Sequence, residues 1–253
     1  MINLRIMATN MVAIHTSTIT IVNTLLNLFS TNPAVDYVPK LREECDSILA
    51  ADNGVWTKLG LNRMIRIDSA IRESLRFSSL SVAAFERAVA APDGLDIGNG
   101  VIVPKGAHIA LPMHMIHEDE SRYENAKQYD PLRFSRPREE YETSLQQVKH
   151  EEPAEANGTK ASGGKRDMKR TLELKNQSAV TPGEGFLSFG HGKHACPGRF
   201  FAANEIKLML AFIVQNYEVK FLEKRPEPEW LLGAAVPGDK STLWIKRRKV
   251  GTK

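Results

Sequence analysis

The chain has 253 residues and a formal net charge of +4, with 42% hydrophobic and 25% charged residues. These proportions are ordinary for a globular protein and exclude a chain that is disordered throughout, collagen-like or globally of low complexity. The two cysteines, Cys45 and Cys196, are too few and too far apart for a disulfide framework, so we expect free thiols in a reducing compartment. The basic residues at 246–249 are weak evidence for nucleic acid, and we expect no nucleic-acid partner.

The first predicted element is a long core helix over residues 4–29, a stretch without Gly or Pro. Apolar residues such as Ile6, Met11 and Ile14 recur there near helical spacing. Polar side chains interrupt every apolar run before it reaches about 18 residues, and no convincing cleavage site follows. We therefore expect a buried helix of a soluble fold rather than a membrane span or a signal peptide.

Two shorter helices follow. Residues 40–51 combine apolar and charged positions in the pattern of an amphipathic surface helix. In 66–77 the apolar residues fall at steps of four, which favours a third helix with Glu73 and Arg76 on its other side.

A change of period then predicts β structure. Four short runs rich in β-forming residues are separated by turn sequences of Gly, Pro, Asn and Asp, at 82–89, 95–97, 101–103 and 108–111. We expect a small antiparallel sheet of hairpins there. The stretch 118–137 that follows reads as loop-rich.

The segment 139–175 is highly charged and holds one aromatic residue, Tyr141. Because it cannot bury enough apolar area to offset the cost of ordering, we expect a mobile surface insertion. After it, 197–217 is predicted as a long helix whose buried face carries Phe201, Leu208, Met209, Phe212 and Ile213.

Short strands near 217–222 and 242–246 close the predicted fold. The fold class is α+β and helix-dominated. We divide the chain into 1–138, a charged insertion at 139–180 that we expect to be disordered, and 181–253, all within one domain.

The most informative stretch is the glycine-rich loop 186–199, which carries Cys196 immediately before the last helix. The helix N-terminus and the basic residues Lys193, His194 and Arg199 favour a thiolate, which is either a nucleophile or a metal ligand. The alternative is a small core residue. No acid stands near to orient a histidine base, and two distant cysteines do not make a zinc site.

The spacing Phe189-x-x-Gly192-x-His194-x-Cys196-x-Gly198 resembles the haem-binding loop of the haem-thiolate monooxygenases, the cytochrome P450 family. The resemblance implies that Cys196 is the axial ligand of haem iron. It places the other four residues at cofactor-binding positions.

Two further matches fall in the same chain order. Glu73-Ser-Leu-Arg76 resembles the family's Glu-x-x-Arg helix, and 131–134 resembles its Pro-Glu-Arg-Phe segment, with Leu132 in place of Glu. The resemblance implies a buried structural network of Glu73, Arg76 and Arg133. Taken alone, a Glu and an Arg three residues apart usually form a solvated pair of little energetic consequence.

The resemblance also assigns roles outside the loop. Arg87 and His194 match positions that pair haem propionates, although an exposed Arg is an ordinary alternative for Arg87. In 12–17, Thr16 and His15 match the family's proton-delivery positions, with Ala13 in place of Gly and His15 in place of an acid. A helical Thr commonly does no more than bond a carbonyl one turn back.

The resemblance runs from about residue 4 to 247, the charged insertion excepted, and covers the C-terminal half of the cytochrome P450 fold. It implies a truncated chain that hydroxylates C–H bonds of a lipophilic small molecule with O₂, most like fungal members of secondary-metabolite biosynthesis. Segments 80–85 and 233–237 match the walls of the substrate pocket. The resemblance also implies that the electrons for the reaction come from NADPH through an NADPH–cytochrome reductase.

Full-length members lie at the endoplasmic reticulum membrane, whereas this chain is expected to lack the anchor and to be cytoplasmic or of unknown location. Two alternatives stay open. The first is that the chain is a catalytically inactive remnant, because an open site forfeits much of the burial that holds haem. The second is that it is a cysteine hydrolase.

Overall fold

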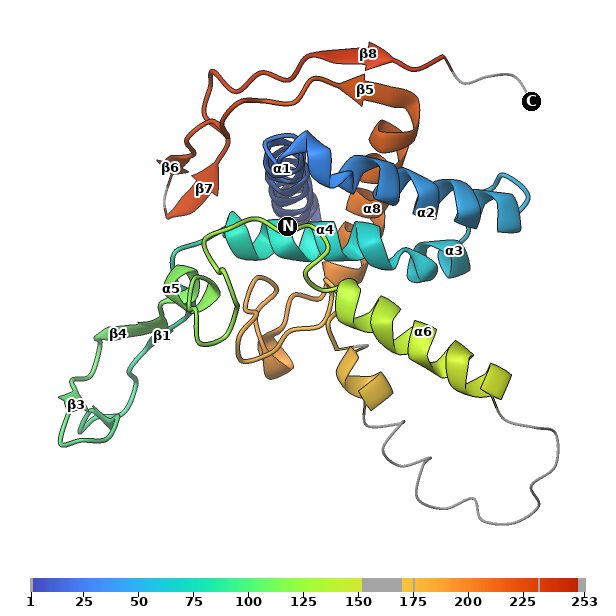
Figure 1. The fold of residues 1–253 in the computed structure, drawn as a ribbon. Helices are drawn as coiled ribbons and strands as arrows, with labels where there is room; N and C mark the ends of the chain where they lie inside the picture. The colour runs from blue at the N-terminus through green and yellow to red at the C-terminus, as the bar shows by residue number, and fades with distance from the viewer. Residues whose placement is uncertain (1, 152–169, 175, 232, 250–253) are drawn as a thin grey trace.

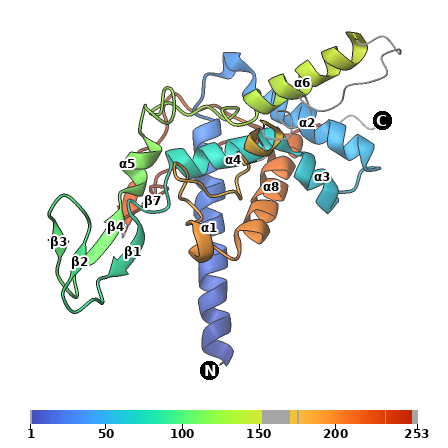
Figure 2. The same cartoon turned by 90° about the horizontal axis from the view of Figure 1, so that it is seen from below.

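The computed structural model describes residues 2–151, 170–174, 176–231 and 233–249, with the side chains of 145–151 left out. Its elements, as Figures 1 and 2 label them, are α1 Ile2–Leu28, η1 Pro33–Val35, α2 Tyr37–Ala51, α3 Lys58–Arg63, α4 Ile65–Phe77, β1 Ala84–Ala88, β2 Leu95–Asp96, β3 Ile102–Val103, β4 His108–Leu111, α5 Met113–His117, α6 Arg136–Glu151, η2 Gly192–His194, α8 Arg199–Asn216, β5 Tyr217–Val219, β6 Glu229–Leu231, β7 Ala234–Val236 and β8 Ile245–Arg247.

The core is a group of packed helices. Helix α4 packs against α1, α2 and α8, and α8 also contacts α1 and α2 (Figure 1). Every residue of α4 from 67 to 76 is buried, so this helix forms the centre of the fold. The helix-dominated α+β class is confirmed, with small two-stranded antiparallel pairs outside the helical core.

Helix α1 forms as predicted, but only its C-terminal half lies in the core. The expectation of a fully buried helix is wrong: Ile6, Met11 and Ile14 are 52%, 66% and 60% exposed. The buried half packs against α4 and α8, whereas the other half extends away from the remaining elements (Figure 2). By length and composition α1 is also apolar enough to cross a membrane, and less than half of its most apolar stretch is buried.

The predicted hairpins are present. Strands β1 and β4 pair antiparallel, β2 and β3 continue that arm, and the whole arm projects beyond α5 (Figure 1). A bulge lies between Ala84 and Arg87, and it holds Phe85 at a φ of 58°, an unusual conformation for a bulky residue. The two predicted C-terminal strands form as β5 and β8 and pair antiparallel, while the β6–β7 pair was not predicted.

Helix α2 buries Leu41, Cys45 and Ile48 on one face, as its amphipathic pattern predicted. Helix α3 was not predicted. It begins after Thr57, whose Oγ1 accepts a hydrogen bond of 2.8 Å from the Gly60 N–H and caps the helix.

Helix α8 forms as predicted, but with a different buried face. Phe201 is 66% exposed and Phe212 is 55% exposed. The buried positions are Ala203, Ile206, Lys207, Leu210, Ala211 and Val214. Because apolar residues occur around most of this helix, periodicity does not select one face.

The predicted charged insertion differs in its first part. Residues 139–151 belong to α6, and Glu139 pairs with Arg66 of α4 at 3.1 Å. Charged side chains on the outside of a helix need no apolar burial, so composition alone was misleading there. The prediction also differs at 170–174 and 176–180, where Leu174 and Ala179 are buried, and its residues 152–169 and 175 lie outside the described residues.

Candidate functional site

The loop before α8 is built from short backbone turns. The Gly190 N–H donates to the Leu187 carbonyl at 2.8 Å, and the Cys196 N–H donates to the Phe189 carbonyl at 2.7 Å. Gly190 and Gly192 adopt positive φ angles of 74° and 60°, which glycine reaches without steric cost. These turns bring the backbone of Cys196 beside that of Phe189.

The two cysteines lie in opposite environments. Cys196 is a half-buried free thiol between η2 and α8. Cys45 is fully buried in α2, and burial, together with the charges of Glu44 and Asp46, raises its pKa to about 12. The Cys45 thiol therefore stays protonated and inert, which leaves Cys196 as the chemically available sulfur.

The other predicted loop residues surround Cys196 in sequence with different exposure. Phe189 is half-buried and packs against the core, whereas Gly192, His194 and Gly198 are exposed. A Cβ added at Gly198 would lie 3.9 Å from the Cys196 Sγ, an ordinary contact distance. Arg199 donates from Nη1 to the Cys196 carbonyl at 2.8 Å, which fixes the start of α8.

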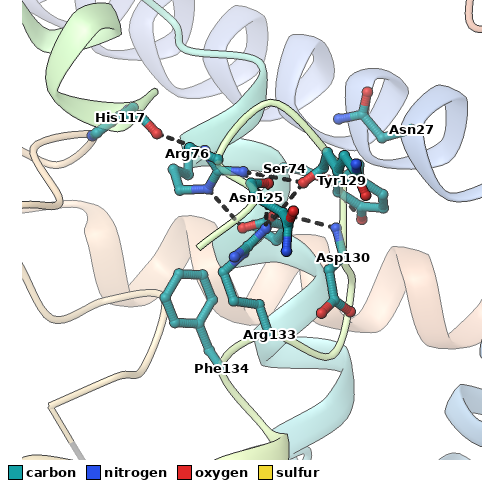
Figure 3. Close-up of polar contacts among 12 residues, drawn as sticks. Asn27, Ser74, Arg76, His117, Asn125, Tyr129, Asp130, Arg133 and Phe134 are labelled. Atoms are coloured by element: carbon teal, nitrogen blue, oxygen red, sulfur yellow. Dashed lines mark hydrogen bonds and ion pairs between the residues drawn. The ribbon is translucent and has the colours of Figure 1, made fainter. Parts of the chain in front are cut away.

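Glu73, Arg76 and Arg133 are brought together by the fold. Arg76 donates to both carboxylate oxygens of Glu73, at 2.8 and 2.7 Å, and Arg133 Nε donates to Glu73 Oε1 at 3.1 Å. Figure 3 shows these contacts from α4 to the segment that carries Asp130 and Arg133. The expectation that Glu73 and Arg76 stand on the other side of their helix is corrected: both side chains are fully buried.

The remaining donors of the two guanidinium groups are satisfied by backbone carbonyls. Arg76 Nη1 donates to the His117 carbonyl at 2.5 Å (Figure 3), and Arg133 Nη2 donates to Gln128 at 3.0 Å and to Asn125 at 3.2 Å. The network therefore ties the centre of the fold to the chain segments that follow α5.

His117 is a contact of the loop that sequence reasoning missed. It is fully buried, and its ring stacks on Phe186 with centroids 5.8 Å apart. Burial, reinforced by the charge of Arg76, lowers its pKa to about 3, so the ring is neutral. No local sequence signal marks a buried histidine at the end of a five-residue helix.

Arg72 was also missed. Its guanidinium lies 3.9 Å from the centroid of the Phe186 ring and 4.8 Å from that of Phe134, and it donates to the Thr181 carbonyl at 3.0 Å. Burial lowers its pKa to about 10. Arg72 therefore joins α4 to the segment that leads into the glycine-rich loop 186–199, called the cysteine loop below.

The remaining predicted site residues lie apart from this network. Thr16 and His15 are exposed on α1, and the Thr16 hydroxyl donates to the Val12 carbonyl at 2.6 Å, the ordinary bond of a helical threonine. Arg87 is exposed on β1, where Nη1 donates to the Glu86 carbonyl. Among the described residues no hydrogen bond or ion pair joins these three to Cys196.

The donor set at Cys196 fits haem better than a free metal ion. In the part of the chain that the structure describes, no three or more His, Cys, Asp and Glu residues gather where they could hold a metal. A protein-built metal site needs several such ligands, whereas haem iron needs only one thiolate because the porphyrin supplies the equatorial nitrogens. A single accessible thiol in a glycine-rich loop is therefore compatible with the one-thiolate ligation of haem iron.

Comparison with known proteins gives the family. The cytochrome P450 family model matches residues 2–237, and the chain belongs to that family. It is 38% identical over 257 aligned positions to cytochrome P450 monooxygenase gloP of Glarea lozoyensis, an alignment that covers 99% of this chain and 43% of that protein.

Two other fungal relatives are slightly less similar. Cytochrome P450 monooxygenase okaG of Penicillium ochrochloron is 35% identical over 96% of this chain and 44% of its own length. Cytochrome P450 monooxygenase 151 of Postia placenta is 34% identical over 96% of this chain and 42% of its own length. The chain spans less than half the length of these curated relatives.

Proposed function

We propose that this chain is the haem-ligating part of a monooxygenase that hydroxylates C–H bonds of a lipophilic small molecule, with Cys196 as the axial ligand of haem iron. The observation that carries the proposal is the pair of cysteines: one thiol is buried and inert, and the other is half-buried in a glycine loop at the start of α8. Membership of the cytochrome P450 family supports it.

When bound, haem supplies the activation of O₂, and the protein supplies orientation and electrostatics. The turns at 187–196 hold the Cys196 thiolate, and the core contact of Phe189 steadies them. Arg87 and His194 are exposed and can pair carboxylates of the cofactor. The exposed Thr16 hydroxyl and His15 imidazole are proposed to hold and move a proton.

The partners follow from the same resemblance. We propose NADPH as the electron source through an NADPH–cytochrome reductase, O₂ as co-substrate, and a place in fungal secondary-metabolite biosynthesis. The similarity to fungal monooxygenases supports this assignment. Attachment to the endoplasmic reticulum membrane, as in full-length members, is proposed for the complete protein.

The test is the spectrum of the haem complex. The full chain is mixed with haemin, reduced and exposed to carbon monoxide, and we expect the red-shifted Soret band of thiolate ligation. Cys196→Ser removes the thiolate and abolishes this band. Cys45→Ala is the matched control because the Cys45 side chain is buried in the core, and it leaves the band in place.

A wild-type complex without the thiolate band, or a band that survives Cys196→Ser, contradicts the proposal. Failure of the chain to take up haemin at all favours an inactive remnant. Labelling of Cys196 by an electrophilic substrate analogue in the absence of haem favours a cysteine hydrolase. Neither His191 nor His194 is hydrogen-bonded to an acid among the described residues, which argues against the hydrolase.

A further inference from the structure

The buried histidine His117 lies between α4 and the beginning of the cysteine loop. On one side, its backbone carbonyl accepts a hydrogen bond from Arg76. On the other, its ring Nε2 is 3.1 Å from the Leu187 backbone nitrogen. Its ring face lies against Phe186, so three kinds of contact meet at one residue, two of them at its side chain.

The hydrogen bonds fix a single tautomer for this ring. The Leu187 nitrogen is a donor only, so Nε2 must accept and carry no proton. Nδ1 then carries the proton and donates to Ser79 Oγ at 3.0 Å, while the Ser79 hydroxyl donates to the Arg76 carbonyl at 3.1 Å. The Leu187 N–H, the two ring nitrogens of His117 and the Ser79 hydroxyl are all satisfied in this arrangement. No other protonation state of the ring satisfies all four groups.

The chain of contacts continues from Leu187 to the cysteine. The Leu187 carbonyl accepts the Gly190 N–H at 2.8 Å, and the Phe189 carbonyl accepts the Cys196 N–H at 2.7 Å. Between them, Ser188 Oγ donates to the Leu75 carbonyl of α4 at 3.0 Å. The position of the Leu187 amide therefore helps to set the turn on which the backbone of Cys196 is fixed.

We propose that His117 is a positioning residue for Cys196: its neutral ring holds the Leu187 amide against the end of α4 and so fixes the loop that presents the thiolate. The spectroscopic consequence for haem rests on the proposed function. The positioning of the loop does not, because it is a property of the protein alone.

Two variants separate hydrogen bonding from packing. His117→Phe keeps a planar ring against Phe186 and loses both nitrogens. His117→Gln loses the ring but offers an amide oxygen to the Leu187 N–H. His114→Phe, on the same helix α5, is the matched control, since His114 is half-buried and contacts Glu118 and Trp230 instead of the loop.

Amide hydrogen exchange of the haem-free full chain is the first measurement. In His117→Phe we expect peptides covering 186–196 to exchange about tenfold faster, the loss of one net hydrogen bond. In His117→Gln we expect the rate within about threefold of wild type, and in His114→Phe no change. Peptides of α2 report global unfolding.

Two outcomes overturn the proposal: unchanged loop exchange in His117→Phe, or equal acceleration of the loop and α2, which shows a general loss of stability. The second measurement is the reduced carbon monoxide spectrum with haemin. The share of thiolate-type Soret band falls in His117→Phe and recovers in His117→Gln. If wild type shows no such band, the proposed function fails, while the exchange result still decides whether His117 positions the loop.

Discussion

The carboxylate of Glu73 and the guanidinium of Arg76 meet through two hydrogen bonds of 2.8 and 2.7 Å, with neither side chain exposed to solvent. Because both charges have left water, their pairing offsets a desolvation cost that a surface pair never meets. Arg133 and the Asp130 N–H share the same carboxylate oxygen, at 3.1 and 3.2 Å. Loss of the carboxylate charge therefore affects four N–H donors on three residues, Arg76, Arg133 and Asp130.

Glu73→Gln is predicted to lower the free energy of unfolding by about 3–5 kcal/mol, because it leaves Arg76 buried without its counter-charge. The measurement is urea-induced unfolding followed by circular dichroism. The matched control is Glu142→Gln, which removes the carboxylate of the exposed pair with Arg138 and costs less than about 0.5 kcal/mol. Equal losses in the two variants would contradict the buried-pair account.

The Glu73–Arg76 pair shows which features the sequence predicts and which it does not. The helical period of 66–77 predicted α4, but it assigned Glu73 and Arg76 to the side away from the core. Periodicity describes a helix with one neighbour, whereas α4 has neighbours on several sides. Only the family resemblance, which rests on order and spacing, pointed to a buried network.

The same reasoning explains the errors at α1 and α8. The apolar pattern predicted both helices correctly, yet Met11 and Phe201 are exposed and Lys207 is buried. Which face is covered depends on the neighbouring elements, which a single helix does not encode. The cysteine loop was found because its glycines and Cys196 are adjacent in sequence; His117 was not, because it lies about 70 residues from Leu187.

The buried ion pair of Lys207 in α8 and Asp68 in α4 gives a second prediction. Nζ lies 2.6 Å from Asp68 Oδ1, and Asp68 Oδ2 accepts the Ala179 N–H at 2.7 Å. Lys207→Met leaves the carboxylate buried without a cation and lowers the free energy of unfolding by about 3–5 kcal/mol. We expect the double variant Lys207→Met/Asp68→Asn to recover part of this loss.

The control for Lys207 is Lys224→Met. Lys224 pairs with Glu227 at 2.7 Å, nearly the same distance, but both side chains are about four-fifths exposed. Its loss is expected to cost less than about 0.5 kcal/mol in the same urea titration. Similar costs at the two positions would show that burial does not determine the strength of the Lys207 pair.

The pH dependence of stability follows from His117. Its pKa falls from 6.5 to about 3 in the folded chain, mainly through burial, with Arg76, His114 and Arg72 as the nearby charges. Below about pH 6.5 the unfolded chain binds a proton that the folded chain does not. This contribution is therefore complete above pH 6.5 and is lost as the pH falls toward 3, by up to about 1.4 kcal/mol per pH unit.

The measurement compares the urea midpoints of wild type and His117→Gln at two pH values. One is about pH 7.5, above the ordinary pKa of histidine, and the other is about pH 5, below it. Wild type is expected to lose more stability between the two, because glutamine does not titrate. His108→Gln is the control for loss of an exposed histidine, since the side chains of His108 and its partner Glu86 are both largely exposed. Parallel slopes for wild type and His117→Gln would rule out this origin of the acid sensitivity.

The last prediction concerns the backbone of the cysteine loop. Gly190 has a φ of 74°, and a Cβ there would lie 3.1 Å from the His194 carbonyl oxygen. Gly190→Ala therefore adds a close contact to a conformational cost of about 1–2 kcal/mol.

Gly98→Ala is the matched control, because Gly98 has a φ of 92° in the hairpin arm with open space around it. We expect both variants to lose stability in urea, but only Gly190→Ala to reduce the thiolate-type Soret band, since only this glycine shapes the turn that holds Cys196. A normal band in Gly190→Ala, or an equal decrease in Gly98→Ala, would separate haem ligation from the geometry of the loop.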